Sequence, residues 1–185
     1  LNWDVPFTSQ APHGIWDIEH EEFCEEASAV MVGRYFHDRT IGSADEADEA
    51  LNELKNWQLE HLGFFESTTA VQTANMIREV YGLTVRLDHD LAADHLKRQL
   101  AAGSLILIPA AGRQLGNPYY KQPGPIYHML VVKGYTSDGR FITNDPGTKR
   151  GADFVYLYDR LISAIGDYNA GNPSQGERVV LIISK

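Results

Sequence analysis

The chain has 185 residues, enough for one domain with a buried core, and no linker, repeat or low-complexity tract divides it. We therefore expect a single domain over residues 1–185. Hydrophobic residues make up 43% and charged residues 22%, which excludes a chain that is disordered throughout. The net charge of −9 argues against a nucleic-acid binder and suits an extended peptide or a cationic substrate better. The longest apolar runs are strand-sized, so we expect no membrane-spanning segment.

The first half of the chain carries mostly helical patterns. After an extended segment over residues 5–14, Ala27, Val30 and Met31 follow the helical period. Ser43 precedes an acidic helix, and Gly82 ends another. These signals predict helices over residues 23–36, 44–59, 67–81 and 91–102, with a short strand over 83–87.

The second half carries strand patterns. Asp138-Gly139 between two apolar runs is a strong signal for a hairpin. Helices followed by a largely antiparallel sheet form an α+β arrangement. We expect strands over residues 104–109, 127–135, 141–144, 154–158 and 179–183, with a short helix over 159–165.

Cys24, the only cysteine, lies in the first turn of a predicted helix. The free N–H groups and the dipole of a helix start stabilise a thiolate, which a cysteine nucleophile needs. The alternative is a buried cysteine that packs as a small apolar side chain. Glu25 and Glu26 oppose a thiolate, so a nucleophilic Cys24 requires them to point away from the sulfur or to pair with a cation.

His128 begins an apolar strand directly after a loop rich in proline and glycine, a typical place for a catalytic base. The following hairpin brings Asp145 back toward this end of the strand. A carboxylate there would accept the Nδ1–H of His128 and leave Nε2 facing the sulfur. Alternatively, Asp145 caps the turn that it begins, and Asn144 orients the histidine.

Several segments, taken in order, resemble the C39-like peptidase family, from Val5 to about Asp167. They are Val5-Pro-Phe-Thr-Ser-Gln10, Trp16, Cys24-Glu-Glu-Ala27-Ser28, His128-Met-Leu-Val-Val-Lys-Gly-Tyr135 and Asn144-Asp145-Pro146. The more familiar Cys-Gly-Pro-Ala-Ser of this family is here Cys-Glu-Glu-Ala-Ser. That departure concerns how the thiolate is activated and which substrate is accepted.

The resemblance implies a papain-like fold and a cysteine peptidase that cleaves peptide bonds through a thioester. It places Cys24 as nucleophile, His128 as base and Asp145 as the residue that orients the base. It also offers Gln10 for the oxyanion hole, although Gln10 lies 14 residues before Cys24 (24 − 10). Members of this compact type often act outside the cytoplasm, and the absence of an initiator methionine allows this, so we expect an extracytoplasmic location.

Three other interpretations remain open. A transglutaminase-like or amidase-like enzyme uses the same three residue types in the same order, and a papain-like module that only binds peptide or cell wall would keep the fold without turnover. A zinc site would need ligands from a group that straddles a loop and shows no familiar pattern. Its members are His13, Asp17, His20, Glu21 and Cys24. We expect no cofactor, and we expect core packing for the aromatic residues Trp3, Trp16, Tyr119, Tyr120 and Tyr127.

Overall fold

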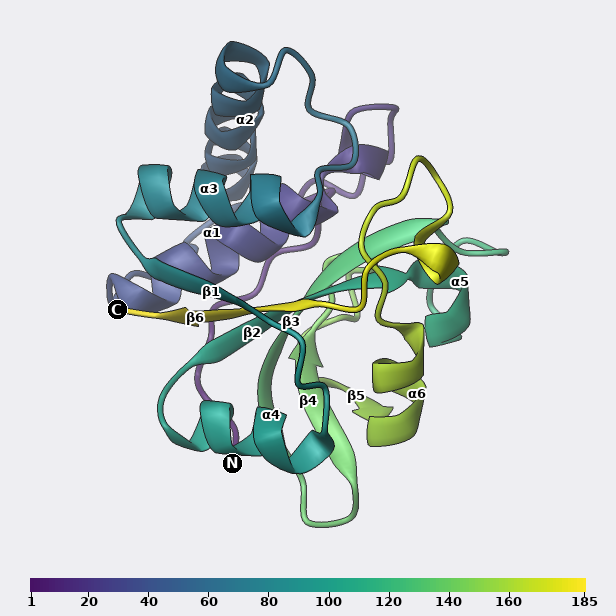
Figure 1. The fold of residues 1–185 in the computed structure, drawn as a ribbon. Coiled ribbons are helices and arrows are strands. Elements are labelled where there is room, and N and C mark those ends of the chain that lie inside the picture. The colour runs from purple at the N-terminus through teal and green to yellow at the C-terminus, as the bar shows by residue number, and fades with distance from the viewer.

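Six strands pair side by side into one sheet, and every pair is antiparallel (Figure 1). The computed structural model describes all residues, 1–185. The order β1-β6-β2-β3-β4-β5 puts the last strand of the chain between the first two. The strands are β1 (Thr84–Asp88), β2 (Leu105–Ala111), β3 (Tyr127–Tyr135), β4 (Arg140–Asn144), β5 (Phe154–Leu157) and β6 (Val180–Ser184).

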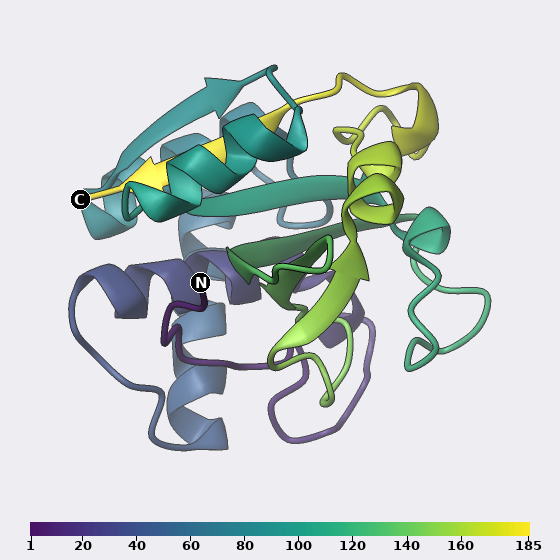
Figure 2. The same ribbon diagram turned by 90° about the horizontal axis from the view of Figure 1, so that it is seen from below.

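Helices cover both faces of the sheet, which gives three layers (Figure 2). On one face, three helices bury apolar side chains such as Met31, Leu51 and Ile77. On the other face, three shorter helices contribute side chains such as Leu96 and Leu161. The first group is α1 (Cys24–Phe36), α2 (Ala44–His61) and α3 (Ala70–Tyr81); the second is α4 (Ala93–Ala101), α5 (Gly112–Leu115) and α6 (Tyr158–Ala164). None of these helices has the length and apolarity needed to cross a bilayer.

This architecture confirms the α+β class and the antiparallel sheet that the sequence predicts. Helix α3 begins at Ala70 because Thr69, the last of the three capping residues Ser67-Thr68-Thr69 that the sequence offers, accepts the N–H of Gln72 and forms a capping box with it. The sequence patterns missed only short elements: α5 and two 3₁₀ turns, η1 (His20–Glu22) and η2 (Pro173–Gln175). Elements of three or four residues are too short to show a hydrophobic period.

A bulge in β3 puts His128 and Asp145 on the same face of the sheet. Phe141 pairs with Tyr135, but beyond Lys133 the pairing shifts by one residue, so Asn144 pairs with Val131. A shift of one residue moves every later side chain to the opposite face of a sheet. Continued past β4, the shifted pairing sets Asp145 opposite Leu130, on the face that His128 also occupies. Without the bulge, His128 and Asp145 would lie on opposite faces of the sheet.

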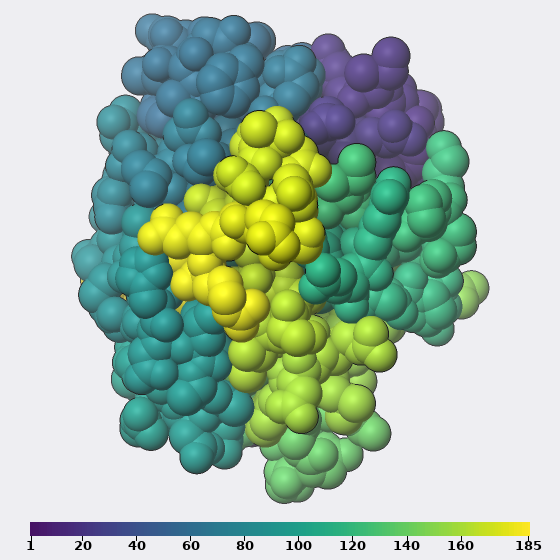
Figure 3. Space-filling view, turned by 45° about the vertical axis from the view of Figure 1, so that its right-hand side comes forward, coloured from purple at the N-terminus to yellow at the C-terminus, as the bar shows by residue number.

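The segment that follows α6 returns across the surface before β6 enters the sheet. In Figure 3 this part of the chain, in yellow, lies between the α2–α3 region in blue and the segment around residues 100–125 in green. Asp167 fixes it, because its carboxylate accepts the backbone N–H of Ala70 at 2.8 Å and the hydroxyl of Tyr127 at 3.4 Å. The C-terminal segment therefore supports the start of α3 and the start of β3 together.

Candidate active site

The N-terminal turn of α1 contacts β3 at the point where β4 has left it. The β3–β4 pairing ends at Val131 and Asn144, so the backbone of Met129 has no partner in β4. Two side chains of α1 take that place. Ser28 donates its hydroxyl to the Met129 carbonyl at 3.2 Å, and the sulfur of Cys24 accepts a backbone hydrogen bond from Met129. Cys24 is thereby held beside the residue that follows His128.

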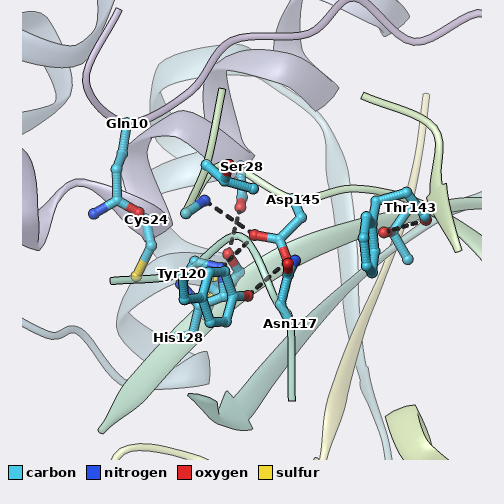
Figure 4. A network of polar contacts seen from close by, with 12 residues as sticks. Gln10, Cys24, Ser28, Asn117, Tyr120, His128, Thr143 and Asp145 are labelled. Atoms are coloured by element: carbon cyan, nitrogen blue, oxygen red, sulfur yellow. Dashed lines mark hydrogen bonds and ion pairs between the residues drawn. The ribbon is translucent and has the colours of Figure 1, made fainter. Parts of the chain in front are cut away.

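His128 and Asp145 are hydrogen-bonded to each other in the interior of the protein (Figure 4). His128 Nε2 lies 2.8 Å from Asp145 Oδ1, and the two side chains are 1% and 0% exposed. The predicted contact between histidine and carboxylate is confirmed, but the predicted ring nitrogen is wrong. Asp145 lies beyond the end of the neighbouring strand, and the nitrogen farther from the backbone reaches it. Nδ1, which has no protein partner, is therefore the nitrogen left for the sulfur.

The Asp145 carboxylate gathers donors from four further residues. Both tyrosine hydroxyls, of Tyr120 and Tyr156, donate to Oδ2 at 2.6 Å. Asn117 Nδ2 donates to the same oxygen at 3.1 Å, and the backbone N–H of Gly147 donates to Oδ1 at 3.0 Å. Burial acts to raise the pKa of Asp145, but the charge and hydrogen bond of His128 and the two hydroxyls outweigh it and lower the pKa to about 2.

Asp145 plays both of the roles that the sequence offers as alternatives. Asp145 both binds His128 and caps the turn through Gly147. Asn144 does neither, because its amide donates to the Val5 carbonyl at 3.0 Å and its oxygen accepts the N–H of Asp153 at 3.3 Å. Asn144 therefore fastens the N-terminal segment to the sheet and does not orient the histidine.

Sequence reasoning missed three partners of Asp145. Tyr120 was expected to be a core aromatic residue, and its ring does pack edge-to-face on His128. Asn117 and Tyr156 carried no signal, since they lie 28 and 11 residues from Asp145 in no recognisable motif. Only the fold brings a loop and β5 to the end of β4.

Gln10 is buried near the start of α1, as its proposed role requires. Its Nε2 donates to the carbonyl groups of His20 at 2.8 Å and Glu21 at 2.9 Å. Both amide hydrogens are thus occupied by the backbone just before Cys24. In this arrangement Gln10 fixes the loop that leads into α1, and its role in an oxyanion hole stays a prediction.

Glu25 neither points away from the sulfur nor pairs with a cation, which corrects the expectation from sequence. The Cys24 thiol donates to Glu25 Oε2 at 2.9 Å, and the backbone N–H of Thr68 donates to Oε1 at 2.7 Å. Gln58 Nε2 donates a hydrogen bond to Glu26 Oε1 at 2.6 Å. Both carboxyl groups are buried, and no ion pair reaches either one. The residue that contacts the thiol is therefore Glu25 and not His128.

This environment sets the protonation of three adjacent side chains. Burial, and then the charge of Glu25, raise the pKa of the Cys24 thiol well above its usual range. Burial also raises the pKa of Glu25 to about 7. For Glu26, burial and the neighbouring Glu25 raise the pKa well above the ordinary value for a carboxyl group. Cys24 in this structure is a protonated thiol.

The side chains considered for zinc do not converge. His20 uses both ring nitrogens on carboxylates, with Nδ1 2.6 Å from Asp17 and Nε2 2.8 Å from Asp48. His13 lies 3.1 Å from Asp45. Cys24 faces Glu25 instead. These ion pairs hold the loop before α1 against α2.

The two buried glutamates should make the protein less stable as the pH rises. A carboxyl group whose pKa is raised by folding stabilises the folded state fully below its unfolded value, here 4.5, and that contribution is lost as the pH rises through about 7. We expect the free energy of unfolding to fall by about 1.4 kcal/mol per pH unit for each proton that folding takes up.

Glu26→Gln removes one of these groups without changing its shape. It should raise the melting temperature more at pH 8 than at pH 5, as measured by thermal unfolding. The exposed Glu49 provides the matched control, and Glu49→Gln should leave the pH dependence unchanged. Equal gains at both pH values for Glu26→Gln would show that Glu26 is ionised in the folded protein.

Comparison with known proteins identifies the family and the fold. The family model described as "Peptidase_C39 like family" matches residues 3–170. The fold is similar to that of a Bacillus anthracis protein described as a "putative C39-like peptidase", with a TM-score of 0.60 and 15% sequence identity over 98% of this chain and 95% of that one. No curated protein matches the sequence. The match to the family model covers most of the chain, and the protein belongs to the peptidase C39-like family.

Proposed function

We propose that the protein is a cysteine peptidase that hydrolyses peptide bonds through a thioester, with Cys24, His128 and Asp145 in a papain-like arrangement. The observation that carries the proposal is the buried hydrogen bond between His128 and Asp145 beside the helix start that bears Cys24. The Asp145 carboxylate accepts hydrogen bonds from five donors, one of them His128, so the imidazole is held in one orientation. Membership of the peptidase C39-like family supports the same reaction.

In the proposed reaction, His128 Nδ1 takes the proton of the Cys24 thiol while Nε2–H stays bonded to Asp145. The sulfur attacks the peptide carbonyl carbon, and the C–N bond of the tetrahedral intermediate breaks as His128 returns the proton to the departing amine. Water, deprotonated by His128, then releases the acid from the thioester. The backbone N–H of Cys24 begins α1 and has no acceptor within the helix, so it can donate to the oxyanion. Gln10 adds a second donor when its amide leaves the two carbonyls that it now binds.

One observation favours a second candidate, a module that binds peptide without cleaving it. The thiol donates to Glu25 and not to His128, and its environment favours the protonated form. A protein that stays in this state would bind without turnover. Transfer of the acyl group to an amine in place of water needs the same residues and differs only in the acceptor. An extracytoplasmic location stays a prediction.

Alkylation of Cys24 separates the enzyme from the binding module. In the enzyme, iodoacetamide should modify Cys24 faster than a free thiol in mildly acidic solution, and His128→Ala should slow this reaction. Cys24→Ala should abolish cleavage of a peptide library with little change in melting temperature, because it leaves only a small cavity. A Cys24→Ala protein that still cleaves at the normal rate, or an alkylation rate that is indifferent to His128→Ala, would contradict the proposal.

Asp145→Asn tests the orienting residue. The amide keeps an oxygen for Gly147 and His128 but offers an NH₂ group where two hydroxyls and Asn117 now donate. It also removes the negative charge that stabilises an imidazolium. Cleavage should fall by roughly 10² or more in kcat, as for triads in which the wrong tautomer is trapped.

The exposed Asp159 on α6 provides the control for this variant, since Asp159→Asn should leave kcat unchanged. Circular dichroism and thermal unfolding would show whether Asp145→Asn keeps the fold. A folded Asp145→Asn protein with nearly normal kcat would mean that Asp145 serves only the turn.

A further inference from the structure

The contact between Cys24 and Glu25 has no part in the reaction proposed above. The thiol donates to Glu25 Oε2 at 2.9 Å, while Oε1 accepts the backbone N–H of Thr68 at 2.7 Å. Glu25 is 1% exposed and Cys24 is 6% exposed. A carboxylate in contact with a nucleophilic sulfur, away from solvent, must influence whether that sulfur carries its proton.

The groups that face Glu25 are acidic or neutral from every side. Glu22 and Glu26 flank it along the chain, and Tyr127 faces it from β3. Asp167 contacts the hydroxyl of Tyr127 from the C-terminal segment, and Glu66 lies near Glu22. No lysine, arginine or histidine is paired with any of these carboxyl groups. The lysines nearby pair instead with Glu19 and Glu21. An ionised Glu25 beside a thiolate would therefore set two negative charges together, with only the His128 imidazolium to balance them.

The position of Thr68 decides which oxygen of Glu25 can carry a proton. Oε1 must stay unprotonated toward the Thr68 N–H, so a proton on Glu25 sits on Oε2, the oxygen that faces the sulfur. Thr68 itself is fixed, because its carbonyl accepts the Tyr127 hydroxyl at 3.0 Å and its side chain lies 2.9 Å from that of Thr73. Protonation thus reverses the hydrogen bond to Cys24 without any movement of the backbone.

We propose that Glu25 is a positioning residue that holds Cys24 as a protonated thiol while Glu25 is ionised, and frees the nucleophile when Glu25 takes up a proton. The proposal rests on the proposed role of Cys24. A proton from solvent binds Glu25 Oε2, and the thiol loses its acceptor. The S–H bond then breaks toward His128 Nδ1, which gains the proton. The thiolate accepts hydrogen bonds from the Glu25 O–H and from the backbone of Met129.

The protonation of Glu25 changes within a pH range that is easily reached in solution. Because burial raises the pKa of Glu25 to about 7, the carboxyl group is protonated in mildly acidic solution and ionised in mildly alkaline solution. An ordinary thiol becomes less reactive as the pH falls, and Cys24 should behave in the opposite way. Cys24 should become more nucleophilic, relative to a free thiol at the same pH, as the pH falls through this range.

Glu25→Gln mimics the protonated state, since its amide is neutral and offers an N–H to the sulfur while its oxygen keeps Thr68. The rate of Cys24 alkylation by iodoacetamide is measured from pH 5 to pH 9 in both proteins. At pH 8 the variant should react roughly tenfold faster or more, because removing an adjacent like charge lowers a pKa by a unit or more. At pH 5 the two rates should converge. The exposed Glu49→Gln should follow the wild type throughout.

An unchanged alkylation rate in Glu25→Gln at pH 8 would overturn the proposal. Should that variant fail to fold, the wild-type protein alone decides: the infrared S–H band should be present at pH 8 and weaken at pH 5, and a band of constant strength contradicts the idea. The proposed function fails separately. If Glu25→Gln changes the alkylation of Cys24 but the protein cleaves no peptide, the proposed peptidase function is wrong and the role of Glu25 stands. If the protein cleaves peptides and Glu25→Gln leaves the pH dependence of cleavage unchanged, the peptidase function stands and the role of Glu25 is wrong.

Discussion

The buried carboxylate of Asp145 is the group on which the site depends. A charge with no exposed surface is tolerated only when donors surround it, and here donors come from β3, from β5, from the loop before β3 and from the turn itself. Each of these segments is distant in sequence from at least one other. The carboxylate therefore fixes the imidazole of His128 and also fastens the loop before β3 to the ends of the paired strands.

The same protein treats its buried carboxyl groups in two opposite ways. Asp145 meets a ring that can carry positive charge and two hydroxyls, and its pKa is lowered despite burial. Glu25 meets a thiol, one backbone N–H and other acids, and burial raises its pKa. Both carboxyl groups are buried, so the opposite pKa shifts come from the hydrogen-bond donors and charges that surround each one. One carboxylate is built to stay charged, and the other is placed where its charge can be lost.

Sequence patterns predict most of this fold because the decisive signals are local. The period of α1, the hairpin turn at Asp138-Gly139 and the return of Asp145 toward His128 all follow from neighbouring residues. The bulge at Lys133 does not, because it is a choice of pairing that the alternating pattern leaves open. The direction of Glu25 is likewise hidden, since it depends on Thr68, 43 residues away. Which ring nitrogen of His128 binds Asp145 depends on where β4 ends relative to His128 along β3.

The place of β6 has a consequence for how the protein is made. β6 leaves the ribosome after the other five strands, yet it fills the gap between β1 and β2. Until residues 180–184 emerge, β1 has no neighbour, and α3 rests on a strand that is not yet attached to the sheet. Thr68 and the start of α3 are in turn fastened by the segment just before β6. The surroundings of Cys24 therefore take their final form only after residues 180–184 have left the ribosome.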